Sequence, residues 1–462
     1  MNKQPVTLLP HQEEAKQKLQ KQHGLILNWQ VGSGKTIGAI AAADQFGETQ
    51  AVVPASLREN FKKEIRAFKP SNKFKVDSYE RFVKNPDINN KVVVFDEAHR
   101  LRTADSARSQ IAQSLAGRAK KVVLLTGTPI QNAPHEIAPL VNIAAGHPVL
   151  PTSEKAFNDR YLSHVKTNPG PVLRALGFQR RDEYVPKNLD EFAQKVKPYF
   201  MNYRPEDSPD APKVRHIKVD VEMSPTQRAV YDVLEKQLPG DLKRDIEDSL
   251  PADKKNTAHL NAFLSATRQV SNTSERFYNT GKKEYSPKLL NIAKITAKSP
   301  GQTLIYSNYL ESGVKPLSEL LSASGIRHGV FTGQQNDVER KKLVNDYNKG
   351  KIKALIVSSS GGEGLDLKGT RQVHITEPHW NEEKINQVIG RSVRFGSHSH
   401  LAPEERTVDV YKYNSVLPAK RSGFLWMKKS RPVSADQYLD NLATKKKQLN
   451  DTFMRAITRK EE

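Results

Sequence analysis

The sequence LILNWQVGSGKT, residues 25–36, joins a short apolar run to a glycine-rich segment. The run Leu25–Leu27 is typical of a buried β-strand, and the apolar periodicity of Thr36–Phe46 predicts a helix directly after the glycines. Glycines permit a tight turn in which several backbone N–H groups face one phosphate, and the helix N-terminus adds partial positive charge. The segment therefore predicts a phosphate-binding loop between a strand and a helix.

This loop divides the binding of ATP and Mg²⁺ between two side chains. Lys35 is expected to reach the β- and γ-phosphates, and Thr36 to offer a hydroxyl to Mg²⁺. The longer form of the motif has another glycine where this chain has Trp29, so the match is partial. A plain structural turn is the alternative, which the position between strand and helix disfavours. The residues assigned to ATP here are Gly32, Ser33, Gly34, Lys35 and Thr36.

Further β-rich runs alternate with helical periodicities, which predicts an α/β fold with parallel sheets. Because the runs are apolar throughout, we expect helices on both faces of each sheet. The first group has strands at 25–27, 51–53, 92–95 and 122–125 and helices at 36–46, 57–68 and 106–115. The second has strands at 304–306, 329–331, 354–357, 373–375 and 408–413 and helices at 314–324, 338–348 and 382–394.

These groups predict two lobes, at residues 1–205 and 286–416. Residues 206–285 form a linker and helical insertion, in which Leu242–Thr267 is expected to be helical. No parallel-strand pattern comparable to those of the two groups is expected over about residues 151–285. Residues 417–462 form a basic C-terminal tail. Its triplet Lys445–Lys447 either contacts phosphate or belongs to a solvated helix face.

Composition indicates a polyanionic partner. The 462 residues include 73 Lys and Arg against 51 Asp and Glu, a formal net charge of +22, which favours nucleic acid over the alternative of solubility alone. The chain has no cysteine, which excludes disulfides, thiolate zinc sites and cysteine nucleophiles. No apolar run approaches the roughly 18 residues of a membrane span. We therefore expect a soluble intracellular protein without a membrane partner.

Polar residues follow two further strands of the first group. Asp96 fits Mg²⁺ coordination, and Glu97 fits the base that polarises the attacking water, whereas an acidic helix cap is the alternative. Two hydroxyls and a glycine, Thr126, Gly127 and Thr128, could sense the γ-phosphate, although such a turn is common in a purely structural role. Both the acidic pair and the threonine turn follow strands of the sheet that holds the phosphate loop, which favours a catalytic role for each.

The second group supplies arginines. Gln387, Arg391 and Arg394 are spaced i, i+4 and i+7, which predicts one face of a helix. Arginines brought to a bound triphosphate neutralise transition-state charge, an effect worth roughly 10³–10⁵ in rate. Surface salt bridging is the alternative. A glycine-rich loop at 358–367, with Gly361, Gly362 and Gly364, could approach phosphate closely.

In this order the motifs resemble the motor core of superfamily 2 helicases and translocases, most closely the Swi/Snf branch. The resemblance covers about residues 5–416. Its motifs are LPHQ at 9–12, VPASL at 53–57, DEAHRL at 96–101, LLTGTPIQN at 124–132, MSPTQ at 223–227, Gly361–Leu367, and Trp380-Asn381 ahead of Gln387–Arg394. The ending FGSH at 395–398, and Asp366 where the branch often has Asn, look more like viral and phage relatives.

The resemblance implies two RecA-like lobes with ATP in the cleft between them. It assigns Gln12 to reading adenine and Asp366 to ATP binding. The residues that couple hydrolysis to movement are His99, Thr126, Gly127 and Thr128. Those that contact DNA are Pro54, Ser56, Thr332, Gly333 and Ser358.

Resemblance and residue chemistry together predict an ATP-driven translocase on double-stranded DNA, with DNA-stimulated hydrolysis and remodelling of protein–DNA complexes or branched DNA. A strand-separating superfamily 2 helicase is the first alternative, and it needs a wedge that the sequence does not reveal. A non-enzymatic nucleic-acid-binding module is the second, which the full set of catalytic side chains disfavours.

Overall fold

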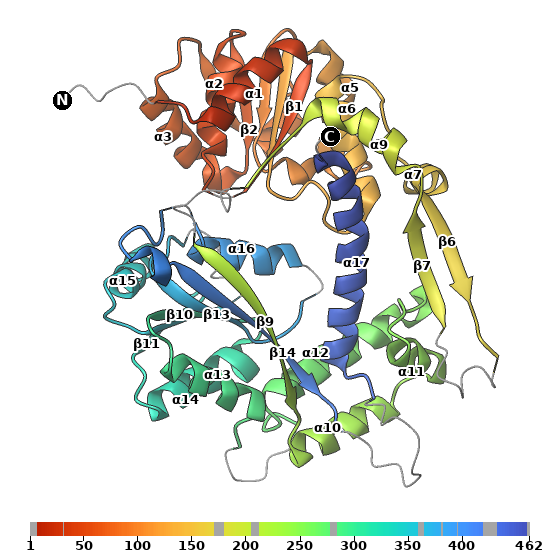
Figure 1. The fold of residues 1–462 in the computed structure, drawn as a ribbon, viewed down its shortest axis with the longest axis vertical. Coiled ribbons are helices and arrows are strands. Elements are labelled where there is room, and N and C mark those ends of the chain that lie inside the picture. Colours follow the sequence, from red (N-terminus) through yellow and green to blue (C-terminus); the bar gives the residue numbers. More distant parts are fainter. Residues whose placement is uncertain are drawn as a thin grey trace. The chain divides into compact units, whose positions relative to one another are not determined.

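The computed structural model describes residues 7–30, 32–170, 180–204, 212–277, 284–358, 365–379, 382–394, 396–418 and 432–459. The chain divides into two compact units. The first lobe comprises residues 1–166, 183–207 and 446–462, and the second comprises residues 167–182 and 208–445. Each contains a six-stranded parallel sheet with helices against it, which confirms the predicted α/β class (Figure 1).

The sheet of the first lobe has the strand order β3-β2-β4-β5-β1-β8, and all its pairs are parallel. Its strands are β1 Gly24–Trp29, β2 Thr49–Val53, β3 Phe74–Ser78, β4 Val92–Phe95, β5 Lys121–Thr126 and β8 Phe200–Tyr203. Alternate residues of one strand enter opposite cores: Leu25 and Leu27 pack on one side and Ile26 on the other. Both faces are therefore buried, as the apolar runs predict.

Helices cover the two faces in two groups. One core contains α1 Pro10–Lys21, α2 Lys35–Asp44 and α3 Arg58–Phe68. The other contains α4 Tyr79–Lys84, α5 Ala107–Leu115, α6 Ile137–Ala145, α7 Glu154–Tyr161 and α9 Leu189–Val196. Every residue of α6 is buried, which suits its almost wholly apolar sequence.

The sheet of the second lobe has the order β11-β12-β10-β13-β14-β9, again with all pairs parallel. Its strands are β9 Lys213–Glu222, β10 Gln302–Ser307, β11 His328–Phe331, β12 Ala354–Ser358, β13 Thr370–Ile375 and β14 Thr407–Val416. Helices α13 Pro287–Ala297 and α14 Lys315–Ala323 pack on one face, and α15 Asp337–Asn348 and α16 Glu382–Ser392 on the other. A separate core joins α10 Pro225–Lys236, α11 Gly240–Glu247, α12 Thr257–Asn272 and the start of α17 Ala435–Thr458.

The prediction of no parallel strand between residues 151 and 285 is wrong, because β8 and β9 both belong to parallel sheets. Strand β9 pairs with β14 over ten residues, from Lys213 opposite Thr407 to Glu222 opposite Val416. It lies at the sheet edge, where charged and apolar residues alternate, so it lacks the continuous apolar run of a central strand. The helical character expected over Leu242–Thr267 is present as two helices, α11 and α12, with Pro251 in the segment between them.

Two lysines of the basic tail hydrogen-bond to protein groups rather than standing free. Lys445 Nζ donates to the carbonyl of Ser249 at 3.0 Å, and Lys446 Nζ to Oδ1 of Asn132 at 2.8 Å. Among the residues described, no helix is both long and apolar enough to cross a membrane. The four-part division of the chain stays a prediction.

Close packing at the start of β1 leads to a stability prediction. A Cβ at Gly24 would lie 2.6 Å from the carbonyl oxygens of Ala144 and Val122, so Gly24→Ala will lower the free energy of unfolding by roughly 1–3 kcal/mol. Urea unfolding measures the change. The control is Gly240→Ala, because nothing lies within 4 Å of a Cβ at Gly240. Equal midpoints for the two variants would contradict this packing.

Candidate functional site

The order β4-β5-β1 brings three predicted motifs to one edge of the first sheet. Phe95 lies opposite Leu124, and Asn28 opposite Thr126, so the carboxyl ends of the three strands are adjacent. The phosphate loop follows β1, the acidic pair follows β4, and the threonine turn completes β5. Carboxyl ends of parallel strands are where α/β proteins bind ligands.

The loop after β1 has the backbone expected of a phosphate cradle. Gly32 and Gly34 have φ of +88° and +73°, which favour glycine, and Gly34 is the N-cap of α2. The hydroxyl of Ser33 donates to the carbonyl of Gln30 at 2.7 Å and closes the turn. No acidic residue lies in the first turn of α2. The loop and helix N-terminus therefore fit the phosphates of ATP.

Helix α1 supports this loop from behind. The buried Gln12 donates through Nε2 to the carbonyl of Gly34 at 3.0 Å and accepts from the N–H of Leu9 at 2.8 Å. A Cβ at Gly34 would lie 2.5 Å from Gln12 Nε2, so this contact also requires a glycine. In the structure Gln12 thus positions the loop, and its predicted role in reading adenine stays a prediction.

His11 is a residue that the sequence analysis did not single out. Its Nε2 lies 2.9 Å from the carbonyl oxygen of Ser33, and its ring stacks on Tyr203 with centroids 3.6 Å apart. The edge of Trp29 packs against the same imidazole at 4.7 Å. Its only signal in the sequence is its place in the LPHQ motif, because Tyr203 is far away in the chain.

Lys35 meets the other two motifs. A Cβ at Gly127 would lie 3.5 Å from Lys35 Nζ, which places the ammonium against the threonine turn. Burial lowers the pKa of Lys35, and the charges of Glu97 and Asp96 oppose that shift. The ammonium is therefore held in a poorly solvated place that anionic groups stabilise.

Asp96 is destabilised as an anion. Burial and then the neighbouring charge of Glu97 raise its pKa to about 6, although Lys35 pulls it down. A divalent cation would relieve this excess of negative charge, and the Asp96 carboxylate with the Thr36 hydroxyl offers the oxygen donors that Mg²⁺ prefers. The residues present therefore fit Mg²⁺.

Glu97 adopts an unusual backbone conformation for a side chain of its size. Its φ is +51°, its N–H donates to Oδ1 of Asp96 at 2.9 Å, and its Oε2 lies 3.3 Å from Nδ1 of His99. Residues held in the left-handed region concentrate at functional sites. Tyr79 fixes the same turn by donating its hydroxyl to the Asp96 carbonyl at 2.8 Å.

A buried carboxylate absent from the predicted site braces the segment after β5. Oε2 of Glu136 accepts from the backbone N–H groups of Gln131 and Asn132, both at 2.7 Å. Its Oε1 lies 3.5 Å from Nε of Arg102, which follows the acidic motif. Glu136 thus links the segments after β4 and β5, and a single Glu outside any motif carried no sequence signal.

In the second lobe, one part of the arginine prediction is wrong. Helix α16 ends at Ser392, so Arg394 lies beyond the helix and not on a face shared with Gln387 and Arg391. The hydroxyl of Ser392 donates to the Ile389 carbonyl at 2.8 Å, a local bond that competes with continuation of the helix.

Arg394 instead pairs with the other predicted ATP residue of this lobe. Its Nη1 lies 3.5 Å from Oδ1 of Asp366, and the N–H of Leu367 donates to the carbonyl of Arg391 at 3.2 Å. Asp366, Arg391 and Arg394 are therefore neighbours, as the ATP assignment requires.

The predicted DNA contacts all lie at strand ends but differ in exposure. Ser56 and Gly333 are exposed, whereas Pro54, Thr332 and Ser358 are buried. Buried side chains can act there only by shaping the loops. The predicted motif residues Gly361, Gly362, Gly364, Trp380, Asn381 and Phe395 lie outside the described part of the chain.

Known proteins are similar in sequence to this chain over most of its length. Residues 76–277 match the SNF2-related domain, and residues 281–396 match the helicase conserved C-terminal domain. A putative ATP-dependent RNA helicase of Acanthamoeba polyphaga mimivirus is 33% identical over 466 residues, covering 98% of this chain and 97% of that protein. A termination factor NPH-I homolog of African swine fever virus is 24% identical, covering 94% and 75%. Among solved structures, the Sulfolobus solfataricus SWI2/SNF2 ATPase core in complex with dsDNA is 17% identical with a TM-score of 0.38, covering 89% and 88%.

The environment of Asp96 predicts a pH-dependent gain in stability on neutralisation. At pH 7.5 without Mg²⁺, Asp96→Asn will raise the free energy of unfolding by roughly 1–3 kcal/mol, because it removes a buried charge. The folded-state pKa of about 6 exceeds the ordinary 3.8, so the penalty in the wild type is complete above pH 6 and shrinks as the pH falls toward 4. The difference in the free energy of unfolding between Asp96→Asn and the wild type must therefore be smaller at pH 5 than at pH 7.5.

Urea unfolding at several pH values in EDTA measures this difference. The matched control is Asp159→Asn on α7, where the side chain is exposed and neutralisation should change little. A variant that is less stable than the wild type at pH 7.5, or a difference independent of pH, would refute the burial argument for Asp96.

Proposed function

Because the chain belongs to the Swi/Snf-like branch of superfamily 2 helicases, in its viral form, we propose that it is an ATP-driven translocase on double-stranded DNA. The observation that carries the proposal is the meeting of Lys35, the Asp96–Glu97 pair and Gly127 at one sheet edge. Each strand end there contributes a group that ATP hydrolysis needs.

The residues of the first lobe divide the chemistry among them. The ammonium of Lys35 would bind the β- and γ-phosphates, and Thr36 and Asp96 would hold Mg²⁺, which would neutralise phosphate charge. The carboxylate of Glu97 orients the attacking water and accepts its proton, while His99 holds that carboxylate. From the second lobe, Arg391 and Arg394 neutralise charge that develops on the transferred phosphate. Gln387 is proposed to act with them.

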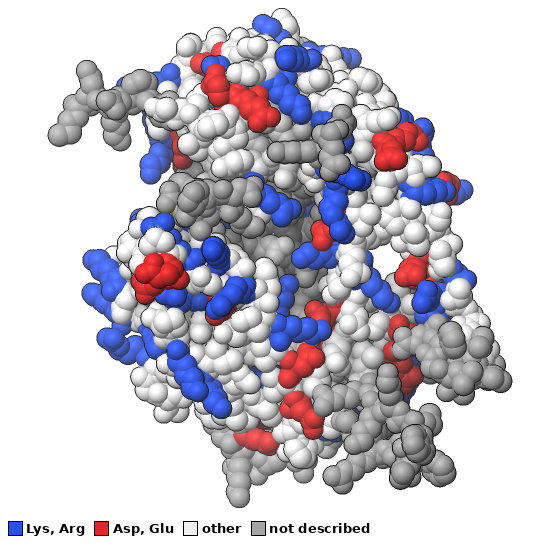
Figure 2. All heavy atoms as spheres, viewed as in Figure 1, with Lys and Arg blue, Asp and Glu red and all other residues white. Residues whose placement is uncertain are grey.

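Basic surface supports a nucleic-acid partner. Figure 2 shows Lys and Arg side chains gathered over α15, which begins four residues after Gly333 and contains Arg340, Lys341 and Lys342. Contacts to phosphate carry no base sequence, so binding should be largely independent of sequence and should weaken steeply with salt.

Strand separation is a second candidate that one feature favours. The mimivirus relative is named an RNA helicase, so RNA belongs among the substrates to be tested. Strands β6 Leu162–Thr167 and β7 Arg181–Pro186 form a two-stranded sheet in which Tyr184 is 46% and Val185 43% exposed (Figure 1). An aromatic side chain on an exposed ribbon can stack on an unpaired base, as a wedge requires.

The ATPase assignment leads to a direct prediction. Lys35→Ala will lower nucleic-acid-stimulated ATP hydrolysis by about a hundredfold or more, because it removes the cation that binds the phosphates. Phosphate release with and without DNA measures this. The control is Lys62→Ala, since the partly exposed Lys62 side chain on α3 forms a local ion pair with Glu59 at 2.8 Å. Unchanged turnover in Lys35→Ala would refute the assignment of the ATP site, whereas no hydrolysis by the wild type would favour a non-enzymatic binding module.

Two substrates separate translocation from strand separation. We expect ATP-dependent release of the third strand from a DNA triplex, and little opening of forked DNA or forked RNA. Strand release in native gels provides the measurement. Efficient fork opening that falls at least several-fold in Tyr184→Ala would instead support the helicase and assign the wedge to the β6–β7 ribbon.

A further inference from the structure

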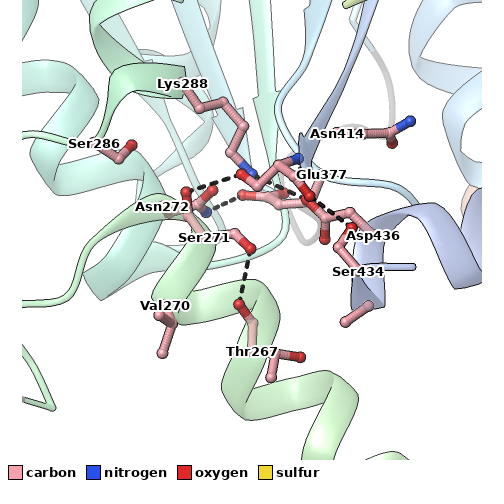
Figure 3. A network of polar contacts seen from close by, with 12 residues as sticks. Thr267, Val270, Ser271, Asn272, Ser286, Lys288, Glu377, Asn414, Ser434 and Asp436 are labelled. Carbon is pink, nitrogen blue, oxygen red and sulfur yellow. Dashed lines mark hydrogen bonds and ion pairs between the residues drawn. The ribbon is translucent and has the colours of Figure 1, made fainter. Parts of the chain in front are cut away.

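A buried carboxylate lies at the carboxyl edge of the second sheet, away from the phosphate loop. Glu377 is fully buried two residues after β13, and both its oxygens accept hydrogen bonds. Oε1 accepts from the hydroxyl of Ser307 at 2.7 Å and from Nδ2 of Asn272, and Oε2 accepts from the N–H of Asn308 at 3.0 Å. One side chain thus joins the end of α12, the end of β10 and the segment that leads from β13 to α16 (Figure 3).

The packing around this carboxylate leaves little freedom. A Cβ at Gly313 would overlap the hydroxyl of Ser307 and lie 3.3 Å from Oε1 of Glu377, so a larger residue is excluded there. The N–H of Thr376 donates to the carbonyl of Tyr306 at 3.0 Å and extends the pairing of β10 and β13 beyond the strands. The contacts therefore hold the two strand ends in one arrangement.

A buried charge pair lies next to this hydrogen-bond network. Nζ of Lys288 on α13 lies 3.5 Å from Oδ2 of Asp436 near the start of α17, and both side chains are almost fully buried (Figure 3). The same Asp436 oxygen accepts from the N–H of Ser415 in β14 at 2.8 Å. The helices behind the sheet are thereby fixed to the strand ends, which gives the Glu377 contacts a rigid support.

The strand order gives the network its functional meaning. Strand β10 lies between β12 and β13, and Ser307 is directly opposite Ser358, the buried last residue of β12, at a strand end where nucleic acid is proposed to bind. On the other side, the chain continues from Glu377 to α16, which carries Arg391. Among the described residues, Ser307 and Glu377 therefore link the strand ends proposed to bind nucleic acid to the segment that carries Arg391 and Arg394.

We propose that Glu377 is a positioning residue that couples nucleic-acid binding at the carboxyl ends of β11 and β12 to placement of Arg391 and Arg394. The inference rests on the proposed function, because it presumes that nucleic acid stimulates hydrolysis. It requires no contact between Glu377 and either ligand. Its expected signature is loss of stimulation while both ligands still bind.

Glu377→Gln tests the coupling with little change of shape. The amide can still present one oxygen to Ser307 and Asn272, but its NH₂ group then faces the N–H of Asn308, so one acceptor is lost. We expect the DNA-stimulated kcat to fall about tenfold or more. Basal turnover, the KM for ATP and the Kd for duplex DNA should stay within about threefold of the wild type.

Two further variants separate coupling from general loosening. Ser307→Ala removes one hydrogen bond to Glu377 and should reduce stimulation at least threefold, which keeps the test decisive if Glu377→Gln folds poorly. Tyr347→Phe is the matched control, because it removes a buried 2.8 Å bond to Thr370 at the opposite, amino end of β13. Urea unfolding should show a similar small loss of stability for Ser307→Ala and Tyr347→Phe. DNA stimulation of ATP hydrolysis should stay normal in Tyr347→Phe.

The outcomes distinguish this inference from the proposed function. Wild-type stimulation in both Glu377→Gln and Ser307→Ala would overturn the role of Glu377 alone. An equal loss of stimulation in Tyr347→Phe would also overturn it, because the effect would then follow stability rather than position. If neither DNA nor RNA stimulates the wild type, the proposed function fails and the coupling role fails with it.

Discussion

The chemistry of the first lobe depends on charges held where water is scarce. Lys35 lies within the electrostatic reach of Asp96 and Glu97 at one sheet edge, and burial opposes the charged forms of Lys35 and Asp96 there. Such an arrangement is costly without a ligand, because two carboxylates compete for one lysine. A divalent cation would supply the missing positive charge. The excess of negative charge therefore favours a bound cation at this sheet edge.

The parallel sheets of both lobes could be predicted because most of their strands are buried on both faces. Runs such as Val92–Phe95 and Ala354–Val357 are apolar at every position, and the structure confirms them as β4 and β12. Edge strands β3 and β9 escaped prediction because polar residues interrupt their apolar pattern, and edge strand β8 escaped it because it has only four residues. The pattern of apolar residues in a strand indicates how deeply that strand is buried. It identifies strands at the edge of a sheet poorly, because these are partly exposed.

The site shows the same division between local and distant information. Lys35, Asp96 and Thr126 were predictable because each motif directly follows an apolar run. Glu136 and Glu377 were not, since each acts through backbone groups that only the fold brings near. Arg394 shows the opposite error, because regular spacing suggested a helical face beyond the point where the helix ends. Supporting residues of this kind carry no spacing rule, so structure is needed to find them.

The charged character of β9 also bears on how the protein behaves at high concentration. A ten-residue strand at the end of a sheet offers a row of backbone donors and acceptors to any other extended chain. Lys213, Arg215 and Lys218 are exposed along it, and two of them are held by Asp409 and Asp440, each at 2.6 Å. Charged side chains along an edge strand discourage its pairing with a second extended chain. The charged residues that interrupt the apolar pattern of β9 in the sequence therefore also protect this sheet edge against aggregation.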